Sequence, residues 1–259
     1  MNSKTNRHPS PIALITGSSR GLGRSMALHL ADRGTDIVVT YRSRDKEALD
    51  VVAAIVAKGR RAVAIQLDVT DSRSFGAFAE TLRSELSRTW QRDRFDFLVN
   101  NAGTGAHVSF AETTEEQFDE LVKVHLKATF FLTQKLLPLL ADGGRVLNVS
   151  SGLARFTFPG YAAYAAMKGG IEVLTRYMAK ELGPRKIAVN VVAPGAVETD
   201  FGGGLVRDNE HVNQLIASQT ALGRVGLPDD IGAAVAMLLA PESAWITGQR
   251  IEVSGGQSL

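Results

Sequence analysis

The sequence predicts an α/β protein in which one doubly wound, parallel, seven-stranded sheet forms a single domain. Three observations support this prediction. Short apolar runs rich in Val and Ile recur along the chain, and longer stretches with helical spacing lie between them. The runs are apolar on both faces, which is typical of parallel strands covered by helices on both sides. No internal repeat or low-complexity linker divides the 259 residues.

Seven apolar runs are too short to be buried helices and are therefore predicted to be strands. They span residues 12–16, 36–41, 62–68, 95–100, 145–150, 187–193 and 249–253. Six stretches with helical spacing are predicted to be helices, at residues 21–33, 46–58, 72–88, 115–140, 161–182 and 228–239. Because crossovers between parallel strands are right-handed, this alternation predicts the Rossmann arrangement.

Two of these helices have recognisable start signals. Thr113 and Thr114 precede two glutamates and Gln117, a pattern similar to a capping box. Pro228 is followed by two aspartates, and both proline and acidic residues favour the first turn of a helix. These signals predict that the helices begin near residues 115 and 228.

Composition narrows the class of protein. Charged residues make up 22% of the chain and the net charge is only +2, which argues against nucleic acid as a partner. The absence of cysteine excludes disulfides, thiol nucleophiles and Cys-ligated metals, and we expect no metal site. Residues 1–10 are polar and basic and are predicted to be a flexible tail. Because no stretch approaches the roughly 18 apolar residues of a membrane span, we expect a soluble cytoplasmic protein with no membrane partner.

A glycine-rich segment follows the first predicted strand. After Thr16 the chain reads Gly17-x-x-x-Gly21-x-Gly23 and then enters a helix. Glycines allow the backbone to approach a diphosphate closely, and a helix N-terminus directs N–H groups at an anion. The pattern therefore indicates a dinucleotide site, although a plain tight turn between strand and helix gives a similar sequence.

Three further motifs lie at the ends of later strands or at the next helix start. They are Asn100-Asn101-Ala102-Gly103, Ser150-Ser151 with Tyr164-Ala165-Ala166-Met167-Lys168, and Pro194-Gly195-Ala196-Val197-Glu198-Thr199. Open α/β sheets bind ligands at this edge. With these motifs in order, the chain resembles the short-chain dehydrogenase/reductase family from about residue 12 to residue 253. The resemblance implies that residues 11–259 form one NAD(P)-binding catalytic domain.

Tyr164 and Lys168 are four positions apart, so on a helix they share one face. A nearby ammonium favours the phenolate, and we expect it to lower the tyrosine pKa toward neutrality. Such a phenol can act as general acid in carbonyl reduction or as general base in alcohol oxidation. The alternative is an ordinary pair on a helix surface. Ser151, at the family's spacing from Tyr164, is expected to hydrogen-bond the substrate oxygen, with Ser150 as the alternative.

The resemblance also implies which residues bind the cofactor. Lys168 would contact the nicotinamide ribose, Asp68 and Val69 the adenine, and Val197 and Thr199 the carboxamide. The full expected set is Gly17, Ser19, Arg20, Gly21, Leu22, Gly23, Tyr41, Arg42, Asp68, Val69, Asn101, Ala102, Gly103, Tyr164, Lys168, Pro194, Gly195, Val197 and Thr199.

His125 departs from the family pattern, which usually has an asparagine here that helps hold a water in the proton path. Histidine also donates and accepts hydrogen bonds, so we count His125 as a catalytic candidate beside Ser151, Tyr164 and Lys168. A histidine on a helix is otherwise commonly structural.

The second strand predicts the choice of nicotinamide cofactor. NAD-using members typically place an acid near the position of Tyr41, and none is present. Arg42 and Arg20 are instead expected to meet the 2′-phosphate of NADP. NADP(H) is therefore the preferred cofactor, and NAD(H) stays possible.

The residues before Tyr164 indicate an apolar substrate pocket. Phe156, Phe158, Pro159 and Tyr161 are expected to form one wall and the segment 199–227 a lid, which could equally be a surface loop. This favours uncharged or lipophilic carbonyls. The lid residues expected to face the pocket are Phe201, Leu205 and Val206.

Family members that reduce acyl-carrier thioesters usually have a basic cluster before the fifth strand. This chain has only Arg145, Arg185 and Lys186 nearby.

The sequence therefore predicts an NADP(H)-dependent oxidoreductase acting on a ketone or secondary alcohol, in which Tyr164 is the general acid or base. A 3-oxoacyl thioester reductase is the alternative among enzymes, and a non-catalytic NADP(H) sensor or scaffold is the alternative outside them. The long helices 115–140 and 161–182 and the C-terminal strand resemble subunit contacts of the family. They predict a homotetramer, with a dimer next.

Overall fold

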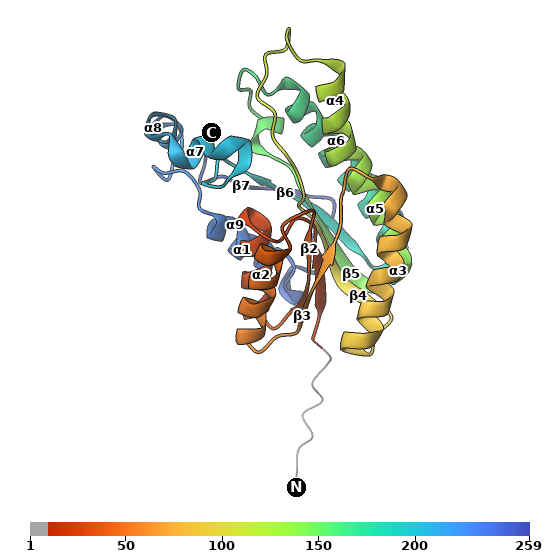
Figure 1. Ribbon diagram of the computed structural model, residues 1–259. Coiled ribbons are helices and arrows are strands. Elements are labelled where there is room, and N and C mark those ends of the chain that lie inside the picture. Colours follow the sequence, from red (N-terminus) through yellow and green to blue (C-terminus); the bar gives the residue numbers. More distant parts are fainter. Residues whose placement is uncertain (1–9) are drawn as a thin grey trace.

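The computed structural model describes residues 10–259, and these residues form a seven-stranded parallel sheet in the order β3-β2-β1-β4-β5-β6-β7 (Figure 1). The chain winds outward from β1 in one direction and then returns to β4 and continues in the other. This reversal confirms the predicted doubly wound fold. The strands are β1 (Ile12–Ile15), β2 (Asp36–Tyr41), β3 (Ala62–Gln66), β4 (Phe95–Asn100), β5 (Leu140–Val149), β6 (Ala188–Pro194) and β7 (Arg250–Val253).

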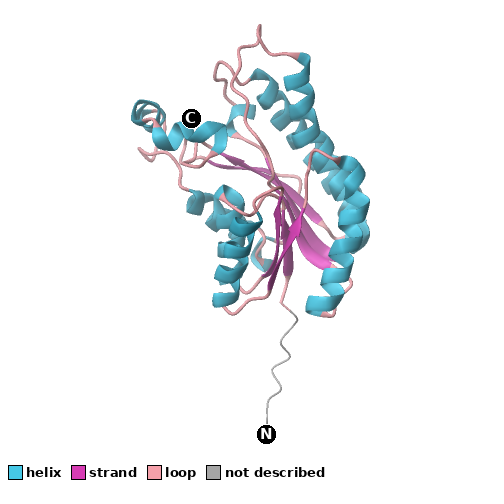
Figure 2. Cartoon of the chain, viewed as in Figure 1, coloured by secondary structure: helices cyan, strands magenta, loops and turns pink. Residues whose placement is uncertain are grey.

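Helices cover both faces of the sheet, as the apolar strands require (Figure 2). One face packs against α1 (Gly21–Asp32), α2 (Asp45–Ala57) and α9 (Pro228–Leu238). The other packs against α3 (Phe75–Glu85), α5 (Ala128–Leu136) and α6 (Ala162–Leu182). The sheet therefore separates two apolar cores.

Strand β1 shows why the pattern folds this way. All four of its side chains are fully buried. Ile12 and Leu14 belong to the core that contains α3, whereas Ala13 and Ile15 belong to the core that contains α1. Because successive side chains of a strand point to opposite faces, a strand in this central position has no polar face.

Two predicted helices are not uniform. The predicted helix 115–140 consists of α4 (Glu115–Leu121), a π-helical turn at Val122–Lys127, α5, and a 3₁₀ turn at Leu137–Leu139 that contains Pro138. The predicted helix 72–88 likewise ends in a π-helical turn at Leu86–Trp90. The predicted capping box is confirmed at Thr114 and Gln117.

The predicted start of the fifth strand at residue 145 is wrong. Strand β5 begins at Leu140, because Leu140 pairs with Phe95 before a register shift in β4. Arg185 also donates a hydrogen bond to the Leu140 carbonyl oxygen, which holds this early segment against the sheet. Glycines at positions 143 and 144 interrupt the apolar run, so the sequence pattern does not indicate a strand before residue 145.

The segment 199–227 is largely helical. It contains a 3₁₀ turn at Phe201–Gly204, α7 (Leu205–Asp208) and α8 (Glu210–Ser218), which lie beside the C-terminus in Figure 1. Gly202, Gly203 and Gly204 all have positive φ, so the glycine run is needed to form this turn. The role of the segment as a lid stays a prediction.

The predicted tail, residues 1–10, lies outside the described residues except for Ser10, whose hydroxyl accepts a hydrogen bond from Arg60. Between residues 10 and 259, every helix is too short or too polar to cross a bilayer.

Candidate active site

The predicted motifs meet where β1, β4, β5 and β6 end. Gly17, Asn101, Ser151 and Gly195 each follow one of these strands by a few residues. This is the edge at which the strand order reverses, where the loops on the two sides of β1 diverge. The topology therefore brings together residues that are far apart in the sequence.

The glycine loop after β1 fits a diphosphate. Gly17 and Gly21 have positive φ, and a Cβ on Gly23 would meet the Asn101 amide nitrogen at 2.7 Å. Helix α1 has no acidic residue in its first turn and no side-chain cap at Arg20, so no carboxylate competes for its N-terminal N–H groups. The residues present thus match the chemistry of a dinucleotide's diphosphate.

Thr16 organises this loop, although the prediction did not include it. Its hydroxyl accepts hydrogen bonds from the backbone N–H groups of Asn101 and Ala102, at 2.9 and 2.8 Å. The Asn101 side chain donates in return to the carbonyl oxygens of Thr16 and Gly17. These bonds join the ends of β1 and β4. A hydroxyl at the last position of the predicted strand 12–16 was the only sequence signal for this role.

Both arginines predicted to read the 2′-phosphate are paired with carboxylates. Arg20 Nη1 lies 2.8 Å from Asp200 Oδ2, at the start of the predicted lid. Arg42 Nε lies 3.4 Å from Asp68 Oδ2. Tyr41 ends β2, next to Arg42, and both of the paired arginines are largely exposed.

The loop after β6 lies against both the glycine loop and the C-terminus. The Ala196 N–H donates to Gln257 Oε1, and Val197 forms a parallel bridge with Gly226. A Cβ on Gly21 would lie 3.9 Å from the Thr199 methyl group. The segment predicted to hold the carboxamide is therefore next to the helix that would receive the diphosphate.

Tyr164 and Lys168 lie one turn apart at the start of α6, and both are buried. Lys168 Nζ donates a 2.8 Å hydrogen bond to the Val149 carbonyl oxygen and lies 5.5 Å from the centre of the Tyr164 ring. The Ser151 side chain acts on the Tyr164 phenol and lowers its pKa, against the larger effect of burial. The hydroxyl of Ser150 instead contacts Glu172 and the Lys168 carbonyl oxygen. This geometry favours Ser151 over Ser150.

The prediction that Lys168 lowers the Tyr164 pKa is wrong when only the chain's own residues surround the phenol. Burial raises this pKa, and the hydrogen bond from Ser151 only partly opposes the effect. Burial also lowers the pKa of Lys168 to about 7, so its ammonium is weakened as a source of positive charge. The sequence argument counted the opposite charge but not the loss of water around both groups.

His125 lies in the π-helical turn after α4 and is 2% exposed. Its Nε2 donates to the Thr104 carbonyl oxygen at 2.8 Å, and its ring meets the Tyr164 ring edge-on at a centroid distance of 5.3 Å. Burial, followed by the charge of Lys168, lowers the pKa of His125 to about 3. The imidazole is therefore neutral, and its Nδ1 is a buried acceptor that no described residue contacts through a hydrogen bond.

Aromatic rings gather around the Tyr164 phenol. Phe201 lies at a centroid distance of 5.6 Å and Tyr161 at 6.4 Å, and Phe158 and His107 pack on Tyr161 at 6.2 and 4.9 Å. His107 was not predicted. Phe156 is not among these ring pairs, because it packs against Gly152 and beneath the Arg155 guanidinium.

Comparisons with known proteins place this geometry in a family. A family profile described as enoyl-(acyl carrier protein) reductase matches residues 17–258. The hydroxynaphthalene reductase-like protein of Metarhizium brunneum is 38% identical, over 95% of this chain and 94% of the relative. The chain belongs to the short-chain dehydrogenase/reductase family.

Solved structures of this family superimpose closely. The promiscuous reductase LugOII, which catalyses a keto-reduction, is 38% identical with a TM-score of 0.90, over 96% of this chain and 98% of the other. The angucycline C-6 ketoreductase LanV with bound NADP is 35% identical with a TM-score of 0.91, over 96% and 95%. In residues 10–259, no group of three or more His, Asp or Glu side chains is placed to hold a metal ion.

The buried Lys168 amine predicts a pH-dependent stability. Its pKa is about 7 in the folded chain and about 10.5 when unfolded, so the unfolded state binds more protons between these values. The penalty of burying Lys168 is fully present below pH 7 and disappears as the pH rises to about 10.5. We expect the free energy of unfolding of Lys168→Met, relative to that of wild type, to be higher at pH 7 than at pH 9.5, as measured by urea unfolding. A difference in free energy of unfolding that does not change with pH would contradict the lowered pKa of Lys168.

Proposed function

We propose that this chain reduces ketones with NADPH, with Tyr164 as the general acid. The observation that carries the proposal is the buried Tyr164–Lys168 pair, with Ser151 acting on the phenol, beside a glycine loop that fits a diphosphate. The family membership and the NADP bound to LanV support the same conclusion.

In this proposal NADPH, when bound, supplies the hydride, and the chain handles the proton. The Tyr164 hydroxyl donates its proton to the carbonyl oxygen as negative charge develops there, and Ser151 donates a hydrogen bond to the same oxygen. The raised pKa of Tyr164 keeps the phenol protonated and ready to donate. Lys168, with a pKa near neutrality, is then able to return a proton to the phenolate.

Replacing Tyr164 by Phe removes only the proton donor, since the ring and its packing are kept. We expect kcat to fall by about 10²–10⁴-fold while the NADPH dissociation constant stays within about threefold. Ketone-dependent loss of NADPH absorbance measures the first quantity, and quenching of protein fluorescence the second. Tyr177→Phe, on the exposed side of the same helix, is the matched control. Unchanged turnover in Tyr164→Phe would exclude Tyr164 as the acid, and a wild type that binds NADPH without reducing any ketone would favour the sensor.

The rings around Tyr164 favour flat aromatic ketones as substrates. Phe201, Tyr161 and Phe158 offer faces and edges on which an aromatic ring system can stack. The names of the similar proteins, which refer to hydroxynaphthalene and to an angucycline, point in the same direction.

An acyl-carrier substrate fits less well. Arg145 donates to the carbonyl oxygens of Leu239 and Ala240, and Arg185 is bound to Asp142. These two arginines are therefore committed within the chain. Rates on a fused-ring ketone, an aliphatic ketone and a 3-oxoacyl thioester would rank the substrate classes directly.

We propose NADP(H) as the cofactor because Tyr41 ends β2 where an acid would select NAD, and Arg42 follows it directly. Arg42→Ala should weaken NADPH binding by roughly ten- to a hundredfold and leave NADH binding nearly unchanged, since only NADPH has the 2′-phosphate. Arg44→Ala is the control, because Arg44 pairs with Glu47 in the next turn. Equal loss for both cofactors would place Arg42 away from the 2′-phosphate.

We propose that the neutral His125 takes the place of the family's asparagine. Its buried Nδ1 lone pair would accept a hydrogen bond from a water or hydroxyl in the proton path. We expect His125→Phe, which keeps a ring, to lower kcat by about tenfold or more, and His125→Asn to recover part of the loss. The pH profile of kcat in both variants should keep the wild-type shape between about pH 5 and 9, because a pKa of about 3 leaves His125 neutral in that range. Wild-type turnover in His125→Phe would make the histidine purely structural.

A homotetramer, with a dimer as the alternative, and a cytoplasmic location also stay proposals. Several large apolar side chains on α4, α5 and α6 are exposed and would suit subunit contacts; they are Phe118, Phe130, Phe131, Val173 and Tyr177. Molar mass by light scattering decides between the assemblies.

A further inference from the structure

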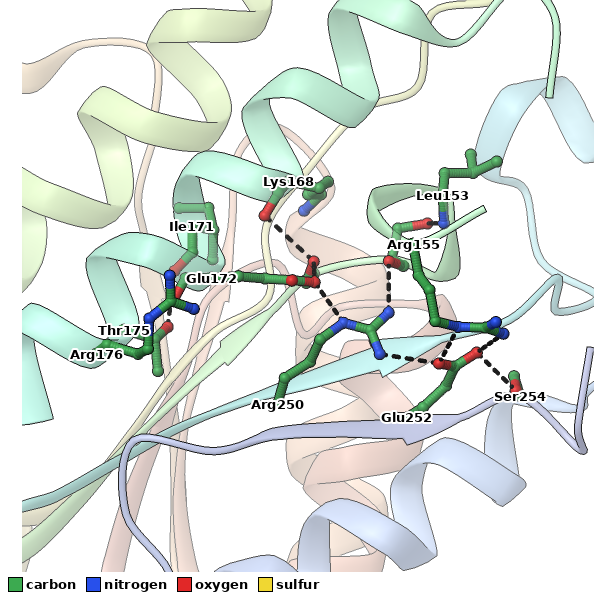
Figure 3. Close-up of polar contacts among 12 residues, drawn as sticks. Leu153, Arg155, Lys168, Ile171, Glu172, Thr175, Arg176, Arg250, Glu252 and Ser254 are labelled. Carbon is green, nitrogen blue, oxygen red and sulfur yellow. Dashed lines mark hydrogen bonds and ion pairs between the residues drawn. The ribbon is translucent and has the colours of Figure 1, made fainter. Parts of the chain in front are cut away.

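Four charged side chains form a continuous chain behind the candidate catalytic residues (Figure 3). Arg250 Nε donates to Glu172 Oε1 at 2.7 Å, and Arg250 Nη1 donates to Glu252 Oε2 at 2.8 Å. Arg155 binds both oxygens of Glu252, each at 2.8 Å. The order is therefore Glu172, Arg250, Glu252, Arg155, with charges that alternate in sign and cancel.

Each end of this charged chain of four side chains contacts a segment of the candidate site. Glu172 accepts a hydrogen bond from Ser150, at the end of β5, and lies one turn after Lys168 on α6. Arg250 Nη2 donates to the carbonyl oxygen of Ser151 at 3.4 Å. Arg155 follows the short turn after Ser151 and donates to the carbonyl oxygens of Gln257 and Ser258. Arg250 is the one member of the four that bonds the backbone of Ser151 itself.

The four side chains are between 15% and 37% exposed, so they are shielded from water more than most ion pairs of this protein. Hydrogen bonds from Arg155 and Arg250 outweigh burial and lower the pKa of Glu252 to about 2. Some of the other pairs are local contacts within a helix, such as Arg83 with Glu80. Here the bonds from Arg250 to Glu172 and from Arg155 to Glu252 span 78 and 97 residues. The arrangement joins β7, α6 and the loop after β5, and it is not explained by local helix stability.

We propose that Arg250 is a positioning residue that fixes the Ser151 loop relative to the Lys168 turn of α6, acting through Glu172 and Glu252. Its planar guanidinium bonds two carboxylates and a backbone carbonyl at once, which an ammonium cannot do with the same geometry. The inference rests on the proposed function, because it assigns Arg250 to the ketone reduction by Ser151 and Tyr164. Arg250 itself lies behind these residues and acts through them.

The test compares Arg250→Met, Arg250→Lys and a matched control in full-length protein. Arg92→Met is the control, because the Arg92–Asp96 pair is similarly shielded but lies at the opposite end of the sheet, before β4. With a fused-ring ketone and NADPH, Arg250→Met should lower kcat by about ten- to a hundredfold and change either KM by less than about threefold. Arg250→Lys keeps the charge and should recover stability and part of kcat. Arg92→Met should lose stability and keep kcat.

Hydrogen exchange gives a readout that does not need turnover. Amides of residues 150–156 should exchange faster in Arg250→Met than in wild type, and Arg92→Met should leave them unchanged. If Arg250→Met does not fold, the same comparison applies to Arg250→Lys. Wild-type kcat together with wild-type exchange at these amides overturns the positioning role. A wild-type protein that reduces no ketone overturns the proposed function instead, and the exchange data then still decide whether Arg250 holds the Ser151 loop.

Discussion

The hydrogen bond from Lys168 Nζ to the Val149 carbonyl oxygen is the contact on which the site depends. It attaches the first turns of α6 to the end of β5, so that Tyr164 and Ser151 meet although they come from different elements. A buried amine with one hydrogen bond is expensive, and the lowered pKa of Lys168 expresses that cost. The surrounding structure has to hold the amine there, and the charged chain from Glu172 to Arg155 lies directly behind this junction (Figure 3).

The sequence predicts most of the fold because the sheet is buried on both faces. Alternating short apolar runs and helical stretches are enough to predict seven strands in a doubly wound parallel sheet, and β2 and β4 begin and end at the predicted residues. Boundaries are missed where tertiary contacts override the local pattern. Leu140 joins β5 because Arg185 and β4 hold it, and the π-helical turns at 86–90 and 122–127 leave no pattern in the sequence.

The candidate site divides in the same way. Ser151, Tyr164, Lys168 and the glycine loop have fixed spacings, so they could be predicted. Thr16 and Arg250 could not, since their bonds are to residues far away in the sequence. The electrostatics also required the structure, because the charges of Tyr164 and Lys168 could be read from the sequence but their burial could not.

The arrangement of the cores explains how one fold can serve different reductases. Tyr164, Met167 and Leu121 belong to a small third apolar cluster, separate from the two that cover the sheet. The rings that line the site, including Phe201 and His107, extend from this third cluster and from loops. Changes among them leave the sheet's packing intact, since the strands bury their side chains elsewhere. Relatives that share about a third of their residues with this chain keep nearly the same backbone, as the TM-scores of 0.90 and 0.91 show, which fits a fold whose two main cores lie away from the rings of the candidate site.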